Sequence, residues 1–231
     1  MLPSSAARAL VNIGLVVGAE RALVVDTGCG PRHAAEILTA VREVTGLPLL
    51  PLVAVNTHAH WDHFFGNATF KAAGVTEFWA HAAAALAMAE TGEWQRQFVA
   101  GHEPEMAEGI APQAEIVAPT HHMTDETVVL DLGGVEVKLF TLGRGHSSGD
   151  LMVGAPGVLF AGDVLEEGAE PDYEDAYPGE WVAVLHRLAT MGGTYPVMVP
   201  GHGRPVDAAF AATMATVVAA SMLPQGRGGR V

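Results

Sequence analysis

Basic residues and cysteines are scarce in this chain of 231 residues. It has 12 Lys and Arg against 26 Asp and Glu, which gives a formal net charge of -14 at pH 7. Proteins that bind nucleic acids contact phosphates through clustered basic side chains, so this composition argues against a nucleic-acid partner. The single cysteine, Cys29, excludes an intrachain disulfide and gives no reason to expect an oxidising compartment.

The sequence also lacks a recognisable targeting segment. Residues 1–17 have no basic region that leads into a small-residue cleavage site, and Asn12 interrupts their apolar part. We therefore expect a cytoplasmic protein. The 49% hydrophobic content is ample for a large core, which favours a folded domain over disorder.

Residues 208–225 lack charges over nearly the length of about 20 residues that a bilayer span needs. Ala, Thr, Ser and Met outnumber Leu and Ile there, which predicts a buried C-terminal helix and no membrane partner. Asp207 is expected to cap this helix. Its helical stripe is expected to consist of Phe210, Met214, Val217 and Ser221. A homo-oligomer contact through the helix is left open.

Strand and helix patterns alternate along the chain. In the first half they predict a hairpin, a helix, a strand, a helical turn, a strand and a helix, over residues 15–28, 31–45, 52–55, 64–73, 77–80 and 82–99. Residues 101–120 are expected to be loop-rich. In the second half they predict two hairpins, a helix and a strand, over residues 127–142, 151–161, 180–191 and 197–199.

This order of elements predicts a sheet-on-sheet core with helices outside. The hairpin that ends at Asp26 resembles the later one that ends at Asp163, since each combines a Val-Gly-Ala turn with a following apolar strand. The similarity fits one domain over residues 1–231 that consists of two related halves, about 1–120 and 121–231.

The densest group of chemistry-bearing residues is Thr57-His58-Ala59-His60-Trp61-Asp62-His63, directly after a predicted strand. In extended backbone, residues two apart share a side, so His58, His60 and Asp62 can point the same way. Imidazoles and carboxylates are the usual zinc ligands, and His58, His60, Asp62 and His63 are too many for one tight site. Two adjacent metals would accommodate them.

Three later segments also end in a candidate ligand, namely His146, Asp163 and His202. Glycines beside each of them permit tight turns, and the strands behind them would fix their positions. A histidine-rich surface loop or one structural zinc site would explain the first segment alone. Repeated placement of ligands beside strand ends favours a metal centre.

As an ordered set, the His-x-His-x-Asp-His motif and the later His, Asp and His resemble the metallo-β-lactamase superfamily, from residue 10 to about residue 205. The resemblance implies an α+β fold of the four-layer αββα type, in which two mixed β-sheets pack face to face with helices on both outer faces. It also implies a dinuclear site at one edge of this sandwich, occupied by two Zn²⁺, with Fe or Mn as alternatives.

The resemblance further assigns roles to individual residues. His58, His60 and His146 would hold the first metal. Asp62, His63 and His202 would hold the second metal, and Asp163 would bridge the two. Asp26 matches a family acid at the end of an early strand, where it would orient a ligand histidine, although a turn or cap acid is an equal alternative.

Such a centre predicts a metallo-hydrolase that acts on a small-molecule substrate. Two divalent ions bring more positive charge than Asp62 and Asp163 neutralise, which favours a bridging hydroxide. This hydroxide would attack an acyl carbonyl in an ester, thioester, lactone or amide-like molecule, because metals lower the pKa of bound water to about 7 and polarise carbonyls. Asp62 is the expected catalytic residue, which would orient the hydroxide or accept its proton.

Other activities share this motif. True metallo-β-lactamases usually carry Cys or Ser where Asp163 stands, and acyl-homoserine lactonases carry Tyr where this chain has Glu166. Glyoxalase II enzymes add a helical domain after the core. The alternatives to the hydrolase are a mononuclear iron dioxygenase of the persulfide dioxygenase type, a β-lactamase-like activity, and a binding protein without turnover.

Several nearby residues have two readings. The acidic residues 164–178 would form either a lid or a solvated loop. Trp61, Phe64 and Phe65 would either line a pocket or pack beneath the ligand loop. Cys29 is expected to be structural. The remaining histidines are expected at the surface or hydrogen-bonded in the core, namely His33, His81, His102, His121, His122 and His186.

Overall fold

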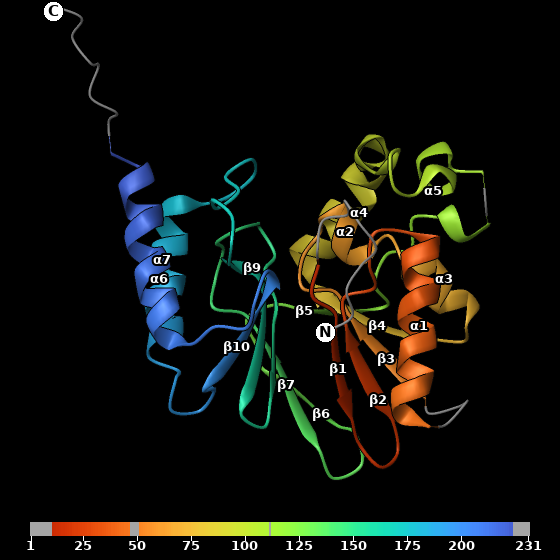
Figure 1. Ribbon diagram of the computed structural model, residues 1–231, viewed down its shortest axis with the longest axis horizontal. Coiled ribbons are helices and arrows are strands. Elements are labelled where there is room, and N and C mark those ends of the chain that lie inside the picture. The colour runs from red at the N-terminus through yellow and green to blue at the C-terminus, as the bar shows by residue number, and fades with distance from the viewer. Residues whose placement is uncertain (1–10, 47–50, 111, 224–231) are drawn as a thin grey trace, which may run out of the picture.

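Two five-stranded β-sheets pack face to face in the computed structural model, which describes residues 11–46, 51–110 and 112–223 (Figure 1). The first sheet has the order β1 (Gly14–Val17), β2 (Ala22–Val25), β3 (Leu52–Val55), β4 (Glu77–His81) and β5 (His121–Met123). The second has the order β10 (Val197–His202), β9 (Val158–Glu166), β8 (Met152–Ala155), β7 (Glu136–Phe140) and β6 (Val128–Asp131). Each half of the chain thus supplies one sheet.

Both sheets are mixed. In the first sheet β1 and β2 form an antiparallel hairpin, while β2 to β5 run parallel. In the second sheet β6 to β9 are antiparallel, and β10 is parallel to β9. Apolar side chains from both inner faces, such as Val25 and Val53 on one side and Leu139 and Val153 on the other, form the core between the sheets.

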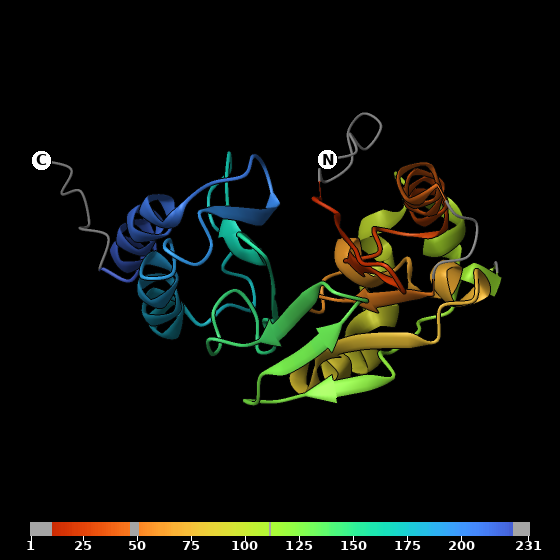
Figure 2. The same ribbon diagram turned by 90° about the horizontal axis from the view of Figure 1, so that it is seen from below.

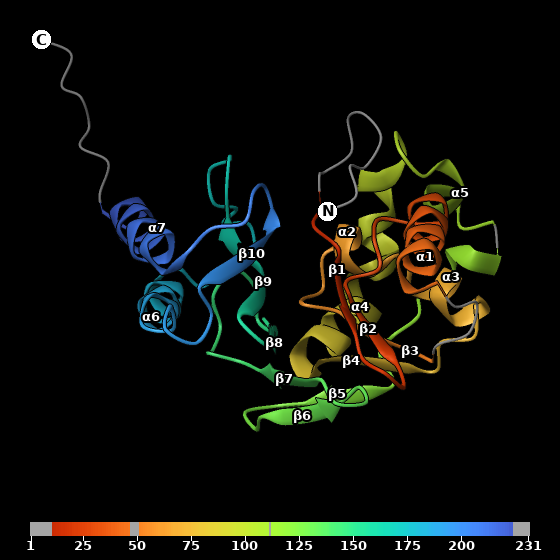
Figure 3. The same cartoon turned by 60° about the horizontal axis from the view of Figure 1, so that its bottom comes forward.

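Helices cover both outer faces of this sandwich, as Figures 2 and 3 show. On the first sheet, α1 (Pro31–Thr45) and α3 (Asn67–Ala72) pack through Ile37, Val41 and Phe70. On the second sheet, α6 (Pro178–Ala189) and α7 (Ala208–Ser221) pack through Trp181, Leu185 and Met214. The remaining helices α2 (Trp61–Phe64), α4 (Ala82–Gln95) and α5 (Pro104–Glu108) gather beside one end of the first sheet. The predicted fold class is confirmed.

Most predicted elements are present, and some boundaries differ. Gly46 ends α1 in the left-handed conformation with φ 64°, as the sequence suggests. The long helix predicted over residues 82–99 is α4 followed by a 3₁₀ turn, Arg96–Val99. Strand β5 was not predicted, because it has three residues, of which His121 and His122 are exposed. Its pairing with β4 makes it a strand.

The buried face of the C-terminal helix α7 (Ala208–Ser221) differs from the predicted one and shares only Met214 with it. Asp207 caps α7 as predicted, since its carboxylate accepts a hydrogen bond from the Phe210 backbone N–H at 3.1 Å. The buried face, however, consists of Ala211, Met214, Ala215 and Val218. Small alanines lie at this face because α6 packs closely against it, which leaves Val217 43% exposed. No helix among the described residues is long and apolar enough to cross a membrane.

Candidate metal centre

The His-rich segment after β3 changes from extended to helical backbone within the motif. His60 is extended, with φ -85° and ψ 145°, whereas Asp62 and His63 lie in the helical turn α2. The prediction that Asp62 continues an extended run with His58 and His60 is therefore wrong. The turn separates the four side chains into two pairs, which face two neighbouring groups of residues.

The strands that carry the later candidates also extend further than predicted. Strand β9 runs through Asp163 to Glu166, and β10 runs through His202. Their parallel pairing continues across two irregularities, so that Pro200 pairs with Gly162 and His202 with Glu166. Asp163 and His202 thus lie within paired strands, while His146 lies in the loop between β7 and β8.

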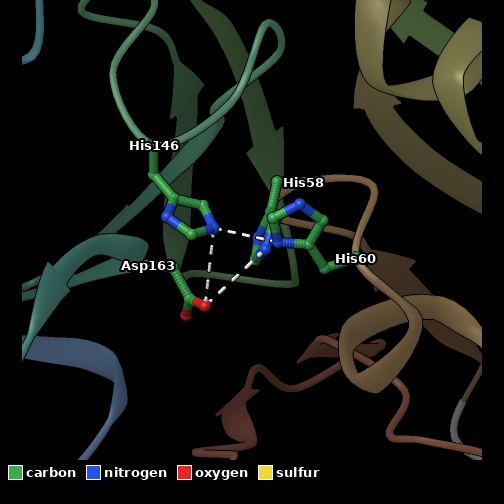
Figure 4. Close-up of side chains that lie close together, drawn as sticks. All are labelled: His58, His60, His146 and Asp163. Carbon is green, nitrogen blue, oxygen red and sulfur yellow. Dashed lines mark hydrogen bonds and ion pairs between the residues drawn. The ribbon is translucent and has the colours of Figure 1, made fainter. Parts of the chain in front are cut away.

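All seven predicted residues converge in space. One group comprises His58, His60, His146 and Asp163, which Figure 4 shows pointing toward one another, and the other comprises Asp62, His63 and His202. Within each group the possible ligand atoms all lie within 4.8 Å of one another. Imidazole and carboxylate groups at such distances have the chemistry of a divalent metal site.

Asp163 lies between the two groups. Its Oδ2 is 3.7 Å from Nε2 of both His58 and His146. Its Oδ1 is 3.4 Å from His63 Nε2, and its Oδ2 is 3.4 Å from His202 Nε2. One carboxylate therefore faces two histidines of each group, which is the geometry that a bridging ligand requires.

Several atoms at this centre are buried without a hydrogen-bond partner. They include His58 Nε2, His63 Nε2 and Asp163 Oδ1, among residues that are at most 7% exposed. Burying an unsatisfied polar atom costs about 1 to 3 kcal/mol, and native proteins rarely tolerate several together. Since unpartnered atoms of His58, His63 and Asp163 gather at one centre, the residues fit bound cations.

Asp26 supports the second group from behind. Its Oδ2 is 2.8 Å from His63 Nδ1, and its Oδ1 accepts the Thr57 backbone N–H at 2.8 Å. Asp26 is the single non-glycine among the described residues with positive φ, at 64°. Left-handed backbone costs a non-glycine residue free energy, so this strain is compensated by the contacts that hold His63 and Thr57. The hydrogen bond expected between Asp26 and a histidine of the centre is present.

Three further acids contact the loop segments of the centre, and their contacts were not predicted. Glu166 Oε1 lies 3.3 Å from His146 Nδ1, and Asp175 Oδ1 lies 3.1 Å from His60 Nε2. Asp150 accepts hydrogen bonds from the backbone N–H groups of Gly145 and Ser147, at 2.9 and 3.0 Å, which fixes the loop that presents His146. Only the Ser-x-x-Asp spacing of Ser147 and Asp150 was a local signal of such a turn.

Burial and nearby carboxylates set the pKa values of the histidines at the centre. Burial opposes protonation of His146, but the Glu166 and Asp163 carboxylates outweigh it and raise the pKa of His146 to about 9. Burial likewise opposes protonation of His202, yet Asp163 and Asp62 raise its pKa to about 10. For His58, burial and the neighbouring His63 hold the pKa well below its usual value. The metal-free centre therefore retains protons that a metal would displace.

A cavity of about 510 Å³ opens beside the two groups. Asp62, Asp163 and His202 line it, together with Trp61 from α2. Phe64 and Phe65 are 1% exposed and pack in the core below, so only Trp61 of the three aromatics borders the cavity. Among the described residues, no other histidine belongs to either group: His81 accepts the Ala83 N–H at the start of α4, and His33 contacts Cys29.

Comparison with known proteins finds similar sequences in one superfamily. The model of the metallo-beta-lactamase superfamily matches residues 7–202. An acyl-coenzyme A thioesterase, MBLAC2 of Homo sapiens, is 31% identical over 205 residues, which cover 83% of this chain and 72% of that protein. A metallo-beta-lactamase type 2 of Bacillus cereus is 25% identical over 205 residues, which cover 86% of this chain and 70% of that protein.

Solved structures show the same fold. A metallo-beta-lactamase from Pontibacter korlensis superposes with a TM-score of 0.73 at 21% identity, over 90% of this chain and 87% of that chain. At this identity the likeness establishes the architecture and leaves the substrate open.

Proposed function

Because the chain belongs to the metallo-β-lactamase superfamily and is a metallo-hydrolase, we propose that it uses two zinc ions to cleave an acyl bond in a small molecule. The observation that carries the proposal is Asp163, whose carboxylate faces histidines of both residue groups at 3.4 to 3.7 Å. We propose His58, His60 and His146 as ligands of one ion, and Asp62, His63 and His202 as ligands of the other, with Asp163 shared between them.

Zinc in such a site lowers the pKa of water to about 7 and polarises a carbonyl, which supplies a nucleophile and an electrophile at neutral pH. We propose that Asp62 helps to position the attacking water. Asp62 lines the cavity and its Oδ2 is 3.2 Å from His202 Nε2, which supports a role for this carboxylate beside the proposed metal ligands. We propose that Asp62 orients the attacking water and accepts its proton.

Acyl bonds are the proposed target because the cavity reaches Asp163 and because relatives are named as enzymes that cleave such bonds. The human relative is named as an acyl-coenzyme A thioesterase, which places thioesters beside esters and lactones among the candidates. The bacterial relatives are named as β-lactamases, which adds β-lactams. A cytoplasmic location accompanies the proposal and rests on the single, buried Cys29.

Metal analysis and a substrate panel test the proposal together. Purified protein loaded with zinc should hold two equivalents and hydrolyse at least one ester, thioester, lactone or β-lactam, and a chelator should abolish the turnover. Protein that binds no metal, or that binds zinc and cleaves none of these bonds, would contradict the proposal. One equivalent of iron with consumption of oxygen would instead support the dioxygenase alternative.

The shared role of Asp163 makes a separate prediction. Asp163→Ala should hold fewer metal equivalents and lose activity on the order of 10²- to 10³-fold in kcat/KM, because both ions lose a ligand. Glu43→Gln, an exposed position on α1, is the control and should retain both properties. Full activity of Asp163→Ala at unchanged metal content would exclude the bridging role.

A further inference from the structure

The cavity beside the metal centre has two chemically different walls. One wall is aromatic and consists of Trp61, Trp94 and Phe98. The Trp94 and Phe98 rings pack edge to face with centroids 4.9 Å apart, yet both side chains stay exposed, Trp94 by 57%. Large aromatics that remain exposed beside a reactive centre are available to a ligand.

The opposite wall is acidic. It consists of Glu166, Asp172, Glu174 and Asp175, and no Lys or Arg is among the described residues that line the cavity. Arginines near the site are already paired: Arg204, two residues after His202, binds Glu167 at 2.9 Å, and Arg144 binds Glu180. The exposed carboxylates of Asp172 and Glu174 therefore add negative charge to this part of the cavity.

Contacts with the centre hold the acidic wall in place. Glu166 Oε1 accepts the Asp172 backbone N–H at 3.1 Å and faces His146 at 3.3 Å. Asp175 Oδ1 lies 3.1 Å from His60 Nε2. The segment between these two anchors carries Asp172 and Glu174, whose side chains remain exposed. Their carboxylates thus occupy a defined place relative to the centre.

The same cavity extends to the metal centre. Asp163 lines the same cavity, is 7% exposed, and has its Oδ1 buried without a partner. Asp163 and the two walls therefore belong to one cavity. A molecule whose carbonyl reaches Asp163 would extend between the aromatic and the acidic wall.

We propose, on the basis of the proposed function, that the preferred substrate is an acyl ester or thioester that carries an organic cation, such as a substituted ammonium, a few atoms from the scissile bond. Aromatic faces attract ammonium groups through the ring quadrupole, and facing carboxylates add Coulomb attraction. An anionic group at the same place meets four carboxylates: Glu166 and Asp175 face His146 and His60, while those of Asp172 and Glu174 are exposed. The cavity thus selects by charge among molecules that share the same acyl bond.

Three matched esters test the charge preference. They share one acyl chain and differ at the end of the alcohol, which carries trimethylammonium, the neutral isostere tert-butyl, or a carboxylate. The zinc-loaded protein should hydrolyse the cationic ester with a kcat/KM about tenfold above the neutral one, and the anionic ester more slowly than both. Equal kcat/KM for the cationic and neutral esters, or preference for the anionic one, would overturn the proposal.

Two double variants test whether the charge preference arises in the cavity. Asp172→Asn with Glu174→Gln should reduce the ratio of cationic to neutral kcat/KM toward one while hydrolysis of the neutral ester continues. Glu43→Gln with Glu136→Gln removes the same net charge on α1 and β7, outside the cavity, and should keep the wild-type ratio. The same loss of ratio in both double variants would assign the preference to net charge and refute a role for the cavity.

A binding measurement separates this proposal from the proposed function. Trp61 and Trp94 report occupancy by fluorescence, and non-hydrolysable ethers of the same three alcohols serve as probes. If no ester is hydrolysed, the proposed function fails, and tighter binding of the cationic ether than of the neutral ether would still support the charge selection. Equal binding of the two ethers would refute it.

Discussion

At the scale of single residues, the centre combines side chains that bind with side chains that hold them in place. His63 faces Asp163 through Nε2 and Asp26 through Nδ1, so its ring is fixed from both sides. Asp26 adopts a left-handed backbone to make this contact. A carboxylate behind a ligand histidine sets its tautomer and raises its basicity, which ties Asp26 to metal affinity.

Asp26→Asn should weaken zinc binding about 10- to 100-fold, because the amide removes the charge that polarises His63. Asn tolerates left-handed backbone well, so the thermal stability of the metal-free protein should change little. Asp26→Ala should lower both zinc affinity and stability, since alanine tolerates that backbone less. Competition with a chromophoric chelator measures the affinity, and unchanged zinc affinity in Asp26→Asn would refute the positioning role.

At the scale of elements, the parallel pair β9 and β10 brings Asp163 and His202 together. Gly201 permits this approach, because a Cβ at that position would lie 1.6 Å from Asp163 Oδ1. The irregular register around Pro200 gives the strands the local bend that turns both side chains toward the centre.

Gly201→Ala should displace the Asp163 carboxylate and lower zinc content together with activity. Gly193→Ala is a matched control, because a Cβ there meets nothing within 4 Å and the backbone needs no positive φ. Elemental analysis after identical zinc loading measures the effect. Equal zinc content in the two variants would show that β9 and β10 adjust without disturbing Asp163.

Alanine substitutions can test which face of α7 is buried. Met214 is 4% exposed and packs with the α6 residues, whereas Val217 is 43% exposed. Met214→Ala should lower the free energy of unfolding by about 2 to 4 kcal/mol, since it leaves a cavity. Val217→Ala should cost at most about 0.5 kcal/mol. Urea denaturation compares the two, and an equal or larger loss from Val217→Ala would place Val217 on the buried face, as the sequence pattern predicted.

At the scale of the whole molecule, the metal centre joins the two halves. His58, His60, Asp62 and His63 come from the segment that follows β3, including α2, while His146, Asp163 and His202 come from the second half of the chain. Because the two halves supply ligands to both groups, metal binding depends on the complete sandwich and couples to folding.

Zinc loading should therefore release protons. With pKa values of about 9 for His146 and about 10 for His202, both rings are protonated at pH 7 in the metal-free protein, and the pKa of His63 is also raised, because Asp163 and Asp62 outweigh the effect of burial. Ligand histidines bind metals as neutral rings, so at least the protons of His146 and His202 should leave at pH 7, and fewer as the pH rises through 9 and 10. Calorimetry in buffers of different ionisation enthalpy counts them, and zinc binding without proton release would contradict these assignments.

The sequence by itself determined the fold class and the set of residues that converge. Hydrophobic periodicity and turn glycines defined the hairpins and helices, because local backbone preferences act over a few residues. The spacing of His58, His60, Asp62 and His63 indicated metal chemistry, since few other functions concentrate such groups.

Only the tertiary structure decided which distant groups meet. The contacts of Glu166 with His146 and of Asp175 with His60 join residues far apart in the chain, and no local pattern encodes them. The strand at His121–Met123 and the buried face of α7 likewise depend on a partner, namely β4 and α6. Packing and pairing between distant segments set these features, because the free energy of burial is shared between both partners and neither segment specifies it alone.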